Sequence, residues 1–360
     1  GKFVEDAPGG RSRLAGGGVR RTVSMPMKGI RANWTLKDTA YPTGSGVDAL
    51  YARILAARGG IKQLGVQELP ATDTLPGATE AAQRIVAAVE NGERIAIHGD
   101  YDADGITGSI ILHSVLKVIA PTLDVPIKIP HRINDGYGLS EAGLLELRAQ
   151  GIDLVVSVDC GITSVGEVEA AHAAGLEVII TDHHEFLLEG LLPQGIVVHP
   201  RLPGATCYPW LAGAGVAWTL ACAIAKAHCN SENIPTVLRT TMAQAMAFAA
   251  IGTIADVVEL LGENRMLAKG GLERLAKTPN LGLQALLKEC GAVGPISEEL
   301  IKFQLAPRLN ALGRLGSAQK AIELFQTTDP KEAVKLAKEI SAVNMKRRAL
   351  QDAMVEQACA

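Results

Sequence analysis

Three short apolar runs in this sequence are each followed directly by a polar cluster. Arg94–His98 precedes the sequence GDYDADG, Asp153–Val158 precedes DCGIT, and Glu177–Thr181 precedes DHHE. A fourth run, Gly195–His199, ends before Pro200. Helix-like segments lie between the runs, which is the pattern of βαβ units. The sequence therefore predicts an α/β fold built on a parallel sheet.

Helical patterns account for much of the remaining chain. They begin at Thr107 and cover about 140–150 and 164–174 between the strands, and they dominate after residue 211. We expect these later helices to flank the sheet: Leu211–Cys229, Thr236–Ile251, Asn264–Ala276 and Leu281–Cys290. A longer pattern from about Asp329 to Gln357 is typical of a helix that connects two lobes. Because this pattern is still running at the last residue, we expect a truncated connecting helix and an incomplete second lobe.

The first polar cluster places three carboxylates on one turn. Asp100, Asp102 and Asp104 alternate directly after the first run. Such groups repel one another unless cations neutralise them. Gly105 permits the tight turn, and a solvated acidic loop is the plain alternative. A calcium loop of the EF-hand type is excluded, because its twelfth position counted from Asp100 is Ile111 and not an acidic residue.

Three further polar clusters add ligands of the same kind. Asp159 follows the second run, and Asp182, His183 and His184 follow the third. Asp256 lies in the apolar segment GTIADVV, where a carboxylate is costly unless it is paired or bound to metal. The plain alternatives are a turn residue for Asp159, surface histidines for the pair, and a helix cap for Asp256.

Together with His98, these clusters provide the ligands for a pair of metal ions. In parallel sheets, ligands bind beyond the carboxyl ends of the strands, so we expect the clusters to converge. The predicted set is His98, Asp100, Asp102, Asp104, Asp159, His183, His184 and Asp256. Oxygen ligands dominate, and imidazoles shift the preference towards manganese. We therefore expect two divalent cations, with Mn²⁺ preferred over Mg²⁺, of the kind that activates water and clamps a phosphoryl group.

Charge and cysteine content restrict partners and compartment. Lys and Arg number 35 against 38 Asp and Glu, a net charge of −3, which argues against a basic coat for nucleic acid but permits a local basic groove. The six cysteines form no Cys-x-x-Cys pair, which indicates reduced thiols and a cytoplasmic protein. The longest apolar stretch, Ala245–Ala255, is too short to span a bilayer, so we expect no membrane association.

The first 32 residues differ from the rest of the chain. They are rich in Gly and Arg, and the chain does not begin with Met. We interpret residues 1–32 as a disordered or non-native basic extension, with an Arg-rich transit peptide as the alternative.

These motifs, in this order, resemble the DHH phosphoesterase superfamily and, within it, the RecJ-type single-stranded-DNA exonucleases. The triplet Asp182-His183-His184 is the signature of the superfamily. Further blocks resemble RecJ sequences: Asn134–Ser140, Leu211–Ala217, Gly252–Val258, Gly262–Arg265 and Ala306–Arg314. The resemblance implies an N-terminal helical segment over 33–92, a DHH catalytic domain over 93–300, the start of a second lobe over 301–328, and a connecting helix over 329–360.

The resemblance also implies a role for each metal-site residue. His98 and Asp102 would bind the first ion, with Asp100 nearby, while Asp104, His183 and Asp256 would bind the second. Asp159 would bridge the two ions. Asp182 would orient the histidines, and His184 would contact the scissile phosphate or assist proton transfer.

The resemblance extends to the substrate and to partners. Arg308, Asn310 and Arg314 would contact phosphate, and Arg132 and Tyr137 would line the DNA groove. The implied activity is 5′→3′ degradation of single-stranded DNA to mononucleotides in recombination and repair, by a monomer. A single-strand-binding protein and a repair helicase would be further partners.

Two departures and three alternatives accompany the resemblance. His199 stands where RecJ sequences usually have Asn, and Glu259 where they usually have Pro. The Gly-Gly-His motif and the OB-fold of RecJ proteins are absent from this sequence. The alternatives are a DHH phosphodiesterase acting on short oligonucleotides or cyclic dinucleotides, an inactive DHH scaffold, and a manganese pyrophosphatase.

Overall fold

A computed structural model describes residues 72–359, apart from 133–134, 187–190 and 232. The predicted basic extension over 1–32 and most of the predicted segment over 33–92 lie outside the described residues. The end of that segment is helical, as α2 (Ala78–Asn91).

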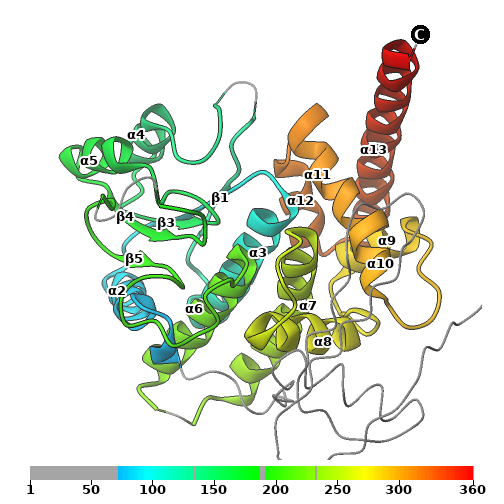
Figure 1. Cartoon of the computed structure of the whole chain (residues 1–360). Helices are drawn as coiled ribbons and strands as arrows, with labels where there is room; N and C mark the ends of the chain where they lie inside the picture. The colour runs from blue at the N-terminus through cyan, green and yellow to red at the C-terminus, as the bar shows by residue number, and fades with distance from the viewer. Residues whose placement is uncertain (1–71, 133–134, 187–190, 232, 360) are drawn as a thin grey trace, which may run out of the picture. The chain divides into compact units, whose positions relative to one another are not determined.

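A five-stranded parallel sheet lies at the centre of the fold, in the order β2-β1-β3-β4-β5 (Figure 1). The strands are β1 (Ile95–Gly99), β2 (Ile127–Lys128), β3 (Leu154–Val158), β4 (Glu177–Thr181) and β5 (Val197–Val198). The predicted parallel sheet and its four apolar strands are confirmed. The two-residue strand β2 was not predicted, because it is too short to show a periodic pattern. In β1 and β3, Gly99 pairs with Val158, so the residues that follow the two strands emerge side by side.

Helices cover both faces of the sheet, and alternate strand residues face the two layers. Ile95 and Ile97 of β1 belong to a core cluster with α2, α3 and α6, whereas Ala96 belongs to a second cluster with α4 and α5. This alternation follows from the period of two in a strand. The helices involved are α3 (Ala103–Ile119), α4 (Glu141–Ala149), α5 (Val165–Ala173) and α6 (Gly213–Cys229).

The remaining helices extend the core beyond the sheet. They are α7 (Thr236–Ala255), α8 (Gly262–Leu275), α9 (Leu281–Glu289), α10 (Glu298–Leu300), α11 (Ala306–Leu315), α12 (Gln319–Gln326) and α13 (Pro330–Cys359). The described residues also form a short 3₁₀ helix, η1 (Thr72–Thr74), and a short π-helix, η2 (Ile301–Leu305). Helix α7 is long and apolar enough to cross a membrane, but most of it is buried in the core, against α3 and α8.

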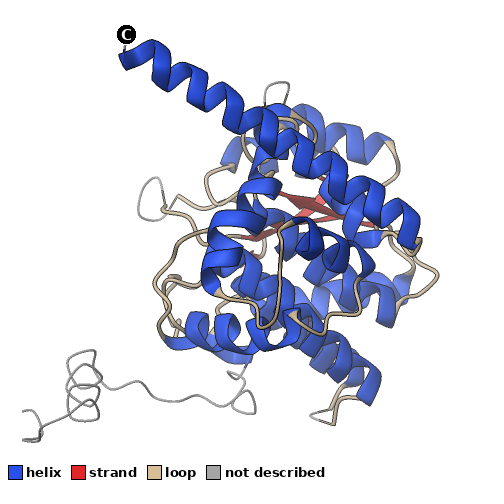
Figure 2. Ribbon diagram, turned by 90° about the vertical axis from the view of Figure 1, so that its right-hand side faces the viewer, coloured by secondary structure: helices blue, strands red, loops and turns tan. Residues whose placement is uncertain are grey.

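The predicted long helix is confirmed as α13, whose two halves differ. Its first half packs through Leu336 and Ile340 against α9, α11 and α12. Every described residue after Arg347 is exposed, and Figure 2 shows this end of the helix projecting away from the other helices.

Candidate metal centre

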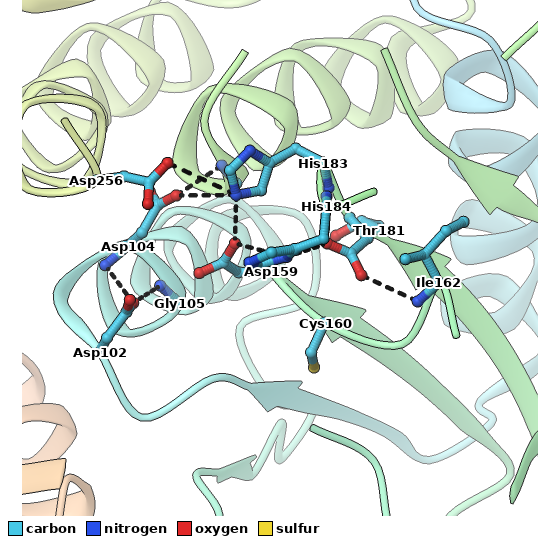
Figure 3. Close-up of polar contacts among 12 residues, drawn as sticks. Asp102, Asp104, Gly105, Asp159, Cys160, Ile162, Thr181, His183, His184 and Asp256 are labelled. Atoms are coloured by element: carbon cyan, nitrogen blue, oxygen red, sulfur yellow. Dashed lines mark hydrogen bonds and ion pairs between the residues drawn. The ribbon is translucent and has the colours of Figure 1, made fainter. Parts of the chain in front are cut away.

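The first acidic cluster forms the beginning of helix α3. The helix starts at Ala103, four residues before the predicted Thr107, so Asp104 and Gly105 lie in its first turn and not in a loop. The reason is a cap: Asp102 Oδ1 accepts hydrogen bonds from the main-chain N–H groups of Asp104 (2.8 Å) and Gly105 (3.1 Å). Both bonds are drawn in Figure 3.

Asp104 is held against the beginning of another helix. Its carboxylate accepts hydrogen bonds from the main-chain N–H groups of Gly213 (2.7 Å) and Ala214 (2.9 Å), at the N-terminus of α6. A Cβ atom on Gly213 would lie 2.4 Å from Asp159 Oδ1, and one on Gly252 would lie 2.3 Å from Asp104 Oδ1. No role for Gly213, Ala214 or Gly252 follows from the sequence, although these residues lie in the blocks Leu211–Ala217 and Gly252–Val258.

Asp159 lies at the end of β3 in an unusual backbone conformation. Its φ of 64° is in the left-handed region, which costs energy for a residue other than glycine. The conformation is fixed by the main-chain N–H of Asp159, which donates to Thr181 O at 2.9 Å. The side chain, only 2% exposed, thereby lies next to Asp104 and His183.

His183 faces three carboxylates from three different elements. Its Nε2 lies 3.0 Å from Asp159 Oδ1, 3.8 Å from Asp104 Oδ2 and 3.8 Å from Asp256 Oδ2 (Figure 3). The backbone of Asp256 is the C-cap of α7, as the helix-cap alternative predicted. Its side chain nevertheless faces the cluster. The negative end of a helix disfavours a carboxylate, which makes a nearby cation more favourable there.

The described residues form three groups whose ligand atoms lie within 4.8 Å of one another. The groups are Asp100–Asp102–Asp159, Asp104–His183–Asp256 and Asp159–His183–His184. Asp159 belongs to two of them, as a bridging ligand would. No group among the described residues includes His98, although it is buried and its Nδ1 has no hydrogen-bond partner. Burial lowers the pKa of His98 to about 4, so its imidazole is neutral and able to bind metal.

The raised pKa values of the carboxyl groups show that negative charge is unfavourable in this cluster without cations. Burial, together with the charge of Asp102, raises the pKa of Asp100 and of Asp104 to about 7. Burial and the charge of Asp104 raise the pKa of Asp256 to about 7 as well. The pKa of Asp159 also lies well above its usual value, for the same reasons.

Several buried ligand atoms in the cluster also make no hydrogen bond. They include Asp100 Oδ1, Asp159 Oδ1 and His183 Nε2, of which the last two lie 3.0 Å apart without the geometry of a hydrogen bond. Buried polar atoms normally have partners, and orphaned oxygen and imidazole atoms that converge in this way fit divalent cations.

Asp182 holds the histidine pair. Its Oδ1 accepts hydrogen bonds from the main-chain N–H of His183 (2.7 Å) and of His184 (3.1 Å), and lies 2.8 Å from His184 Nδ1. Its Oδ2 accepts from the N–H of Ile162 at 2.9 Å. Burial favours the neutral acid, but the bonds from His184 and Ile162 outweigh it and hold the pKa of Asp182 below its usual value. In turn, the hydrogen bond to Asp182 raises the pKa of His184 to about 9.

Tyr137 and Arg132 lie beside the cluster. The hydroxyl of Tyr137 is 3.3 Å from His184 Nε2, and its ring meets the ring of Tyr101 edge to face at 6.1 Å. The guanidinium of Arg132 lies 5.3 Å from the centre of the Tyr101 ring. The exposed side chains of Tyr137 and Arg132, together with the partly buried Tyr101, form a rim next to His184.

The three residues predicted to contact phosphate occupy different environments. Arg308 donates to Ser341 Oγ, Gln304 O and Glu289 O, and so joins α9, η2 and α13. Asn310 Oδ1 accepts from the N–H of Ala103 at 2.8 Å, which ties α11 to the first residue of α3. Arg314 is exposed at the end of α11. Of these three side chains, only that of Arg314 makes no hydrogen bond to another described residue.

Comparison with known proteins gives a consistent set of similarities. Residues 94–250 match the DHH family, N-terminal domain. The chain is 44% identical over 289 residues to the single-stranded-DNA-specific exonuclease RecJ of Bacillus subtilis, covering 79% of this chain and 34% of that protein. It is 41% identical over 283 residues to the Thermus thermophilus RecJ, covering 78% of this chain and 40% of that protein. The chain thus spans between a third and a half of the length of these relatives.

Two crystal structures have the same fold. The structure of exonuclease RecJ bound to manganese superimposes with a TM-score of 0.70 at 39% identity, covering 82% of this chain and 70% of that one. The structure of RecJ from Thermus thermophilus in complex with Mn²⁺ gives a TM-score of 0.72 at 34% identity, covering 86% of this chain and 44% of that one.

Proposed function

Because this chain belongs to the RecJ family of DHH proteins, we propose that it is the catalytic core of a metal-dependent exonuclease acting on single-stranded DNA. The proposed reaction is 5′→3′ hydrolysis to mononucleotides in recombination and repair. The observation that carries the proposal is the convergence of three ligand groups at one edge of the sheet. The alternative of an inactive scaffold has no support in these groups, because every predicted ligand position is occupied by a carboxylate or an imidazole.

The geometry supports two neighbouring cation sites. Asp100 and Asp102 would hold one ion, with His98 as the further predicted ligand, while Asp104, His183 and Asp256 would hold the other. Asp159 lies between them and would bridge. These residues would hold ions whose chemistry is to activate a water molecule and to offset the negative charge of the attacked phosphate. We propose Mn²⁺ as the preferred ion and Mg²⁺ as the alternative, and crystal structures of the Thermus thermophilus RecJ contain each of these metals.

The chain's own residues would position the DNA. The side chain of His184 is 44% exposed, and its hydrogen bond to Asp182 raises its pKa to about 9. It would therefore donate a charge-assisted hydrogen bond to a phosphate oxygen. Tyr137 and Arg132 would hold the adjacent nucleotide by stacking and charge. Arg314 remains the best placed of the three predicted phosphate contacts.

The remaining proposals concern partners and compartment. All six cysteines are free thiols, which supports a cytoplasmic location. We propose a monomer that acts on single-stranded DNA without a membrane, together with a single-strand-binding protein and a repair helicase.

An exonuclease assay tests the proposal. In Asp159→Ala, Mn²⁺-dependent cleavage of single-stranded DNA should be abolished while the circular dichroism spectrum remains that of the folded protein. An unchanged rate would reject the assignment of the metal site. Strands labelled at one end and blocked at the other give the polarity, and degradation from the 3′ end would reject the RecJ-type reaction. Equally rapid cleavage of dinucleotides would favour the DHH enzymes that act on short substrates.

A further inference from the structure

Both N–H groups and both carbonyl groups of the His183–His184 pair form hydrogen bonds with side chains. Both N–H groups donate to Asp182 Oδ1. The carbonyl of His183 accepts from Arg201 Nη2 at 3.0 Å, and the carbonyl of His184 accepts from His199 Nε2 at 2.9 Å. The two latter residues follow β5, so a separate segment fixes the backbone that carries the two histidines.

The environment of His199 sets which of its nitrogens carries the proton. Its Nδ1 accepts a hydrogen bond from the main-chain N–H of Arg201 at 3.1 Å. The proton of the neutral ring is therefore on Nε2, where it faces His184 O. The residue is completely buried, and its ring packs on Phe186 at 4.6 Å between centres, so the imidazole has one orientation.

The guanidinium of Arg201 is fixed in the same way. It lies 4.9 Å from the centre of the Trp210 ring and 5.8 Å from that of Phe186. It also forms an ion pair with Glu185, and its side chain is only 16% exposed. A planar guanidinium that is stacked and paired in this way donates to His183 O without a large loss of entropy.

We propose that His199 and Arg201 are positioning residues for the metal centre, acting through the main chain of the histidine pair. Neither belongs to a ligand group, so their effect is to keep His183 Nε2 directed at the carboxylates of Asp104 and Asp159. Loss of either donor leaves a carbonyl group of the pair without its hydrogen-bond partner, so the backbone of His183 and His184 can adopt other conformations. The inference rests on the metal-binding part of the proposed function.

Paired variants of the whole chain separate the donor from the bulk of the side chain. His199→Gln keeps a donor at the ε position, whereas His199→Leu removes it. Arg201→Met keeps the apolar stem and removes the guanidinium. The matched controls are His113→Leu and Arg148→Met. His113 is a partly buried histidine on α3, and Arg148 on α4 donates to a carbonyl and to a carboxylate. The hydrogen bonds of both side chains lie outside the metal centre.

The readout is Mn²⁺ affinity, measured by calorimetry on protein stripped with EDTA, at a temperature where every variant is folded. We expect His199→Leu and Arg201→Met to weaken binding by about tenfold or more, as outer-shell changes do. His199→Gln and both controls should bind like the wild type. If His199→Leu does not fold, Arg201→Met alone decides.

The outcomes distinguish this inference from the proposed function. Wild-type affinity in both donor-removing variants would overturn the inference, even if their melting temperatures fall. Equal weakening in the control variants would also overturn it, because a general loss of packing would then explain the effect. A wild-type chain that binds Mn²⁺ but leaves single-stranded DNA intact would reject the nuclease proposal alone.

Discussion

Replacing Asp256 by Asn should stabilise the metal-free protein and reduce the further stabilisation that Mn²⁺ provides. Without cations, burial and Asp104 raise the pKa of Asp256 from its ordinary 3.8 to about 7. At about 1.4 kcal/mol per pH unit, this rise corresponds to about 4 kcal/mol of unfavourable charge in the folded protein at pH 8. The side chain is 27% exposed, and solvent screens part of this repulsion. We therefore expect Asp256→Asn to stabilise the metal-free chain by about 2 kcal/mol.

The pH dependence of this effect follows from the direction of the pKa shift. The folded-state pKa is the higher one, so the carboxyl group stabilises the folded protein only while it is protonated. The wild type thus loses stability as the pH rises from about 4 to about 7, and the Asn variant lacks this loss. The advantage of Asp256→Asn should be small near pH 4.5, grow towards pH 7 and remain constant above it.

Denaturant unfolding in EDTA and in Mn²⁺ measures both effects. At a Mn²⁺ concentration of 100 times Kd, the wild type gains about 2.7 kcal/mol, whereas the variant gains less because it lacks one charged ligand. The difference between the two proteins should therefore shrink or reverse on adding metal. Asp352→Asn, on the exposed end of α13, is the control and should change neither state. A variant that is less stable than the wild type in EDTA at pH 8 would refute the reasoning.

Three other predictions test the site and its supports. Mn²⁺ affinity of the wild type should rise as the pH increases from 6 to 8, because carboxyl groups with a pKa of about 7 are still partly protonated in this range and do not bind metal while protonated. Calorimetry at three pH values checks this, and a flat profile would contradict it. Gly252→Ala should lower the free energy of unfolding by about 1–3 kcal/mol, because the new Cβ atom would lie 2.3 Å from Asp104 Oδ1. The control is Gly166→Ala on α5, where no atom lies near the added Cβ, and this variant should not be destabilised. Arg308→Met should lower the free energy of unfolding by about 1–3 kcal/mol, because it removes hydrogen bonds to α9, η2 and α13. The affinity for Mn²⁺ should not change, and weaker metal binding would show that Arg308 acts at the site.

The sequence was sufficient for the fold class, and it predicted which polar clusters lie together. Four apolar runs predicted four strands, because burial on both faces of a parallel sheet leaves a continuous apolar signature. The polar clusters behind the runs converge, because parallel strands end at one edge of the sheet. The two-residue strand β2 and the early start of α3 were missed. A short strand has no period to detect. The cap that starts α3 is the side chain of Asp102, a residue whose position in the sequence indicates only a metal ligand.

The environments of the predicted substrate residues depend on tertiary contacts. Arg308 and Asn310 have the chemistry to bind phosphate, but the structure directs the first to carbonyl and hydroxyl oxygens and the second to the main chain of α3. Arg314, from the same block, stays exposed. Residue type alone does not distinguish these cases, since all three side chains are polar donors at the positions expected for phosphate contacts.

Residue type and local periodicity are enough to show which groups carry charge and at which strand ends they lie. How closely these groups approach one another depends on the tertiary structure. Gly213 and Gly252 lack the Cβ atoms that would collide with Asp159 and Asp104. His199 and Arg201, distant in sequence from the first cluster, hold the main chain of the histidine pair. Such contacts depend on distances between separate elements, and no local pattern in the chain encodes a distance.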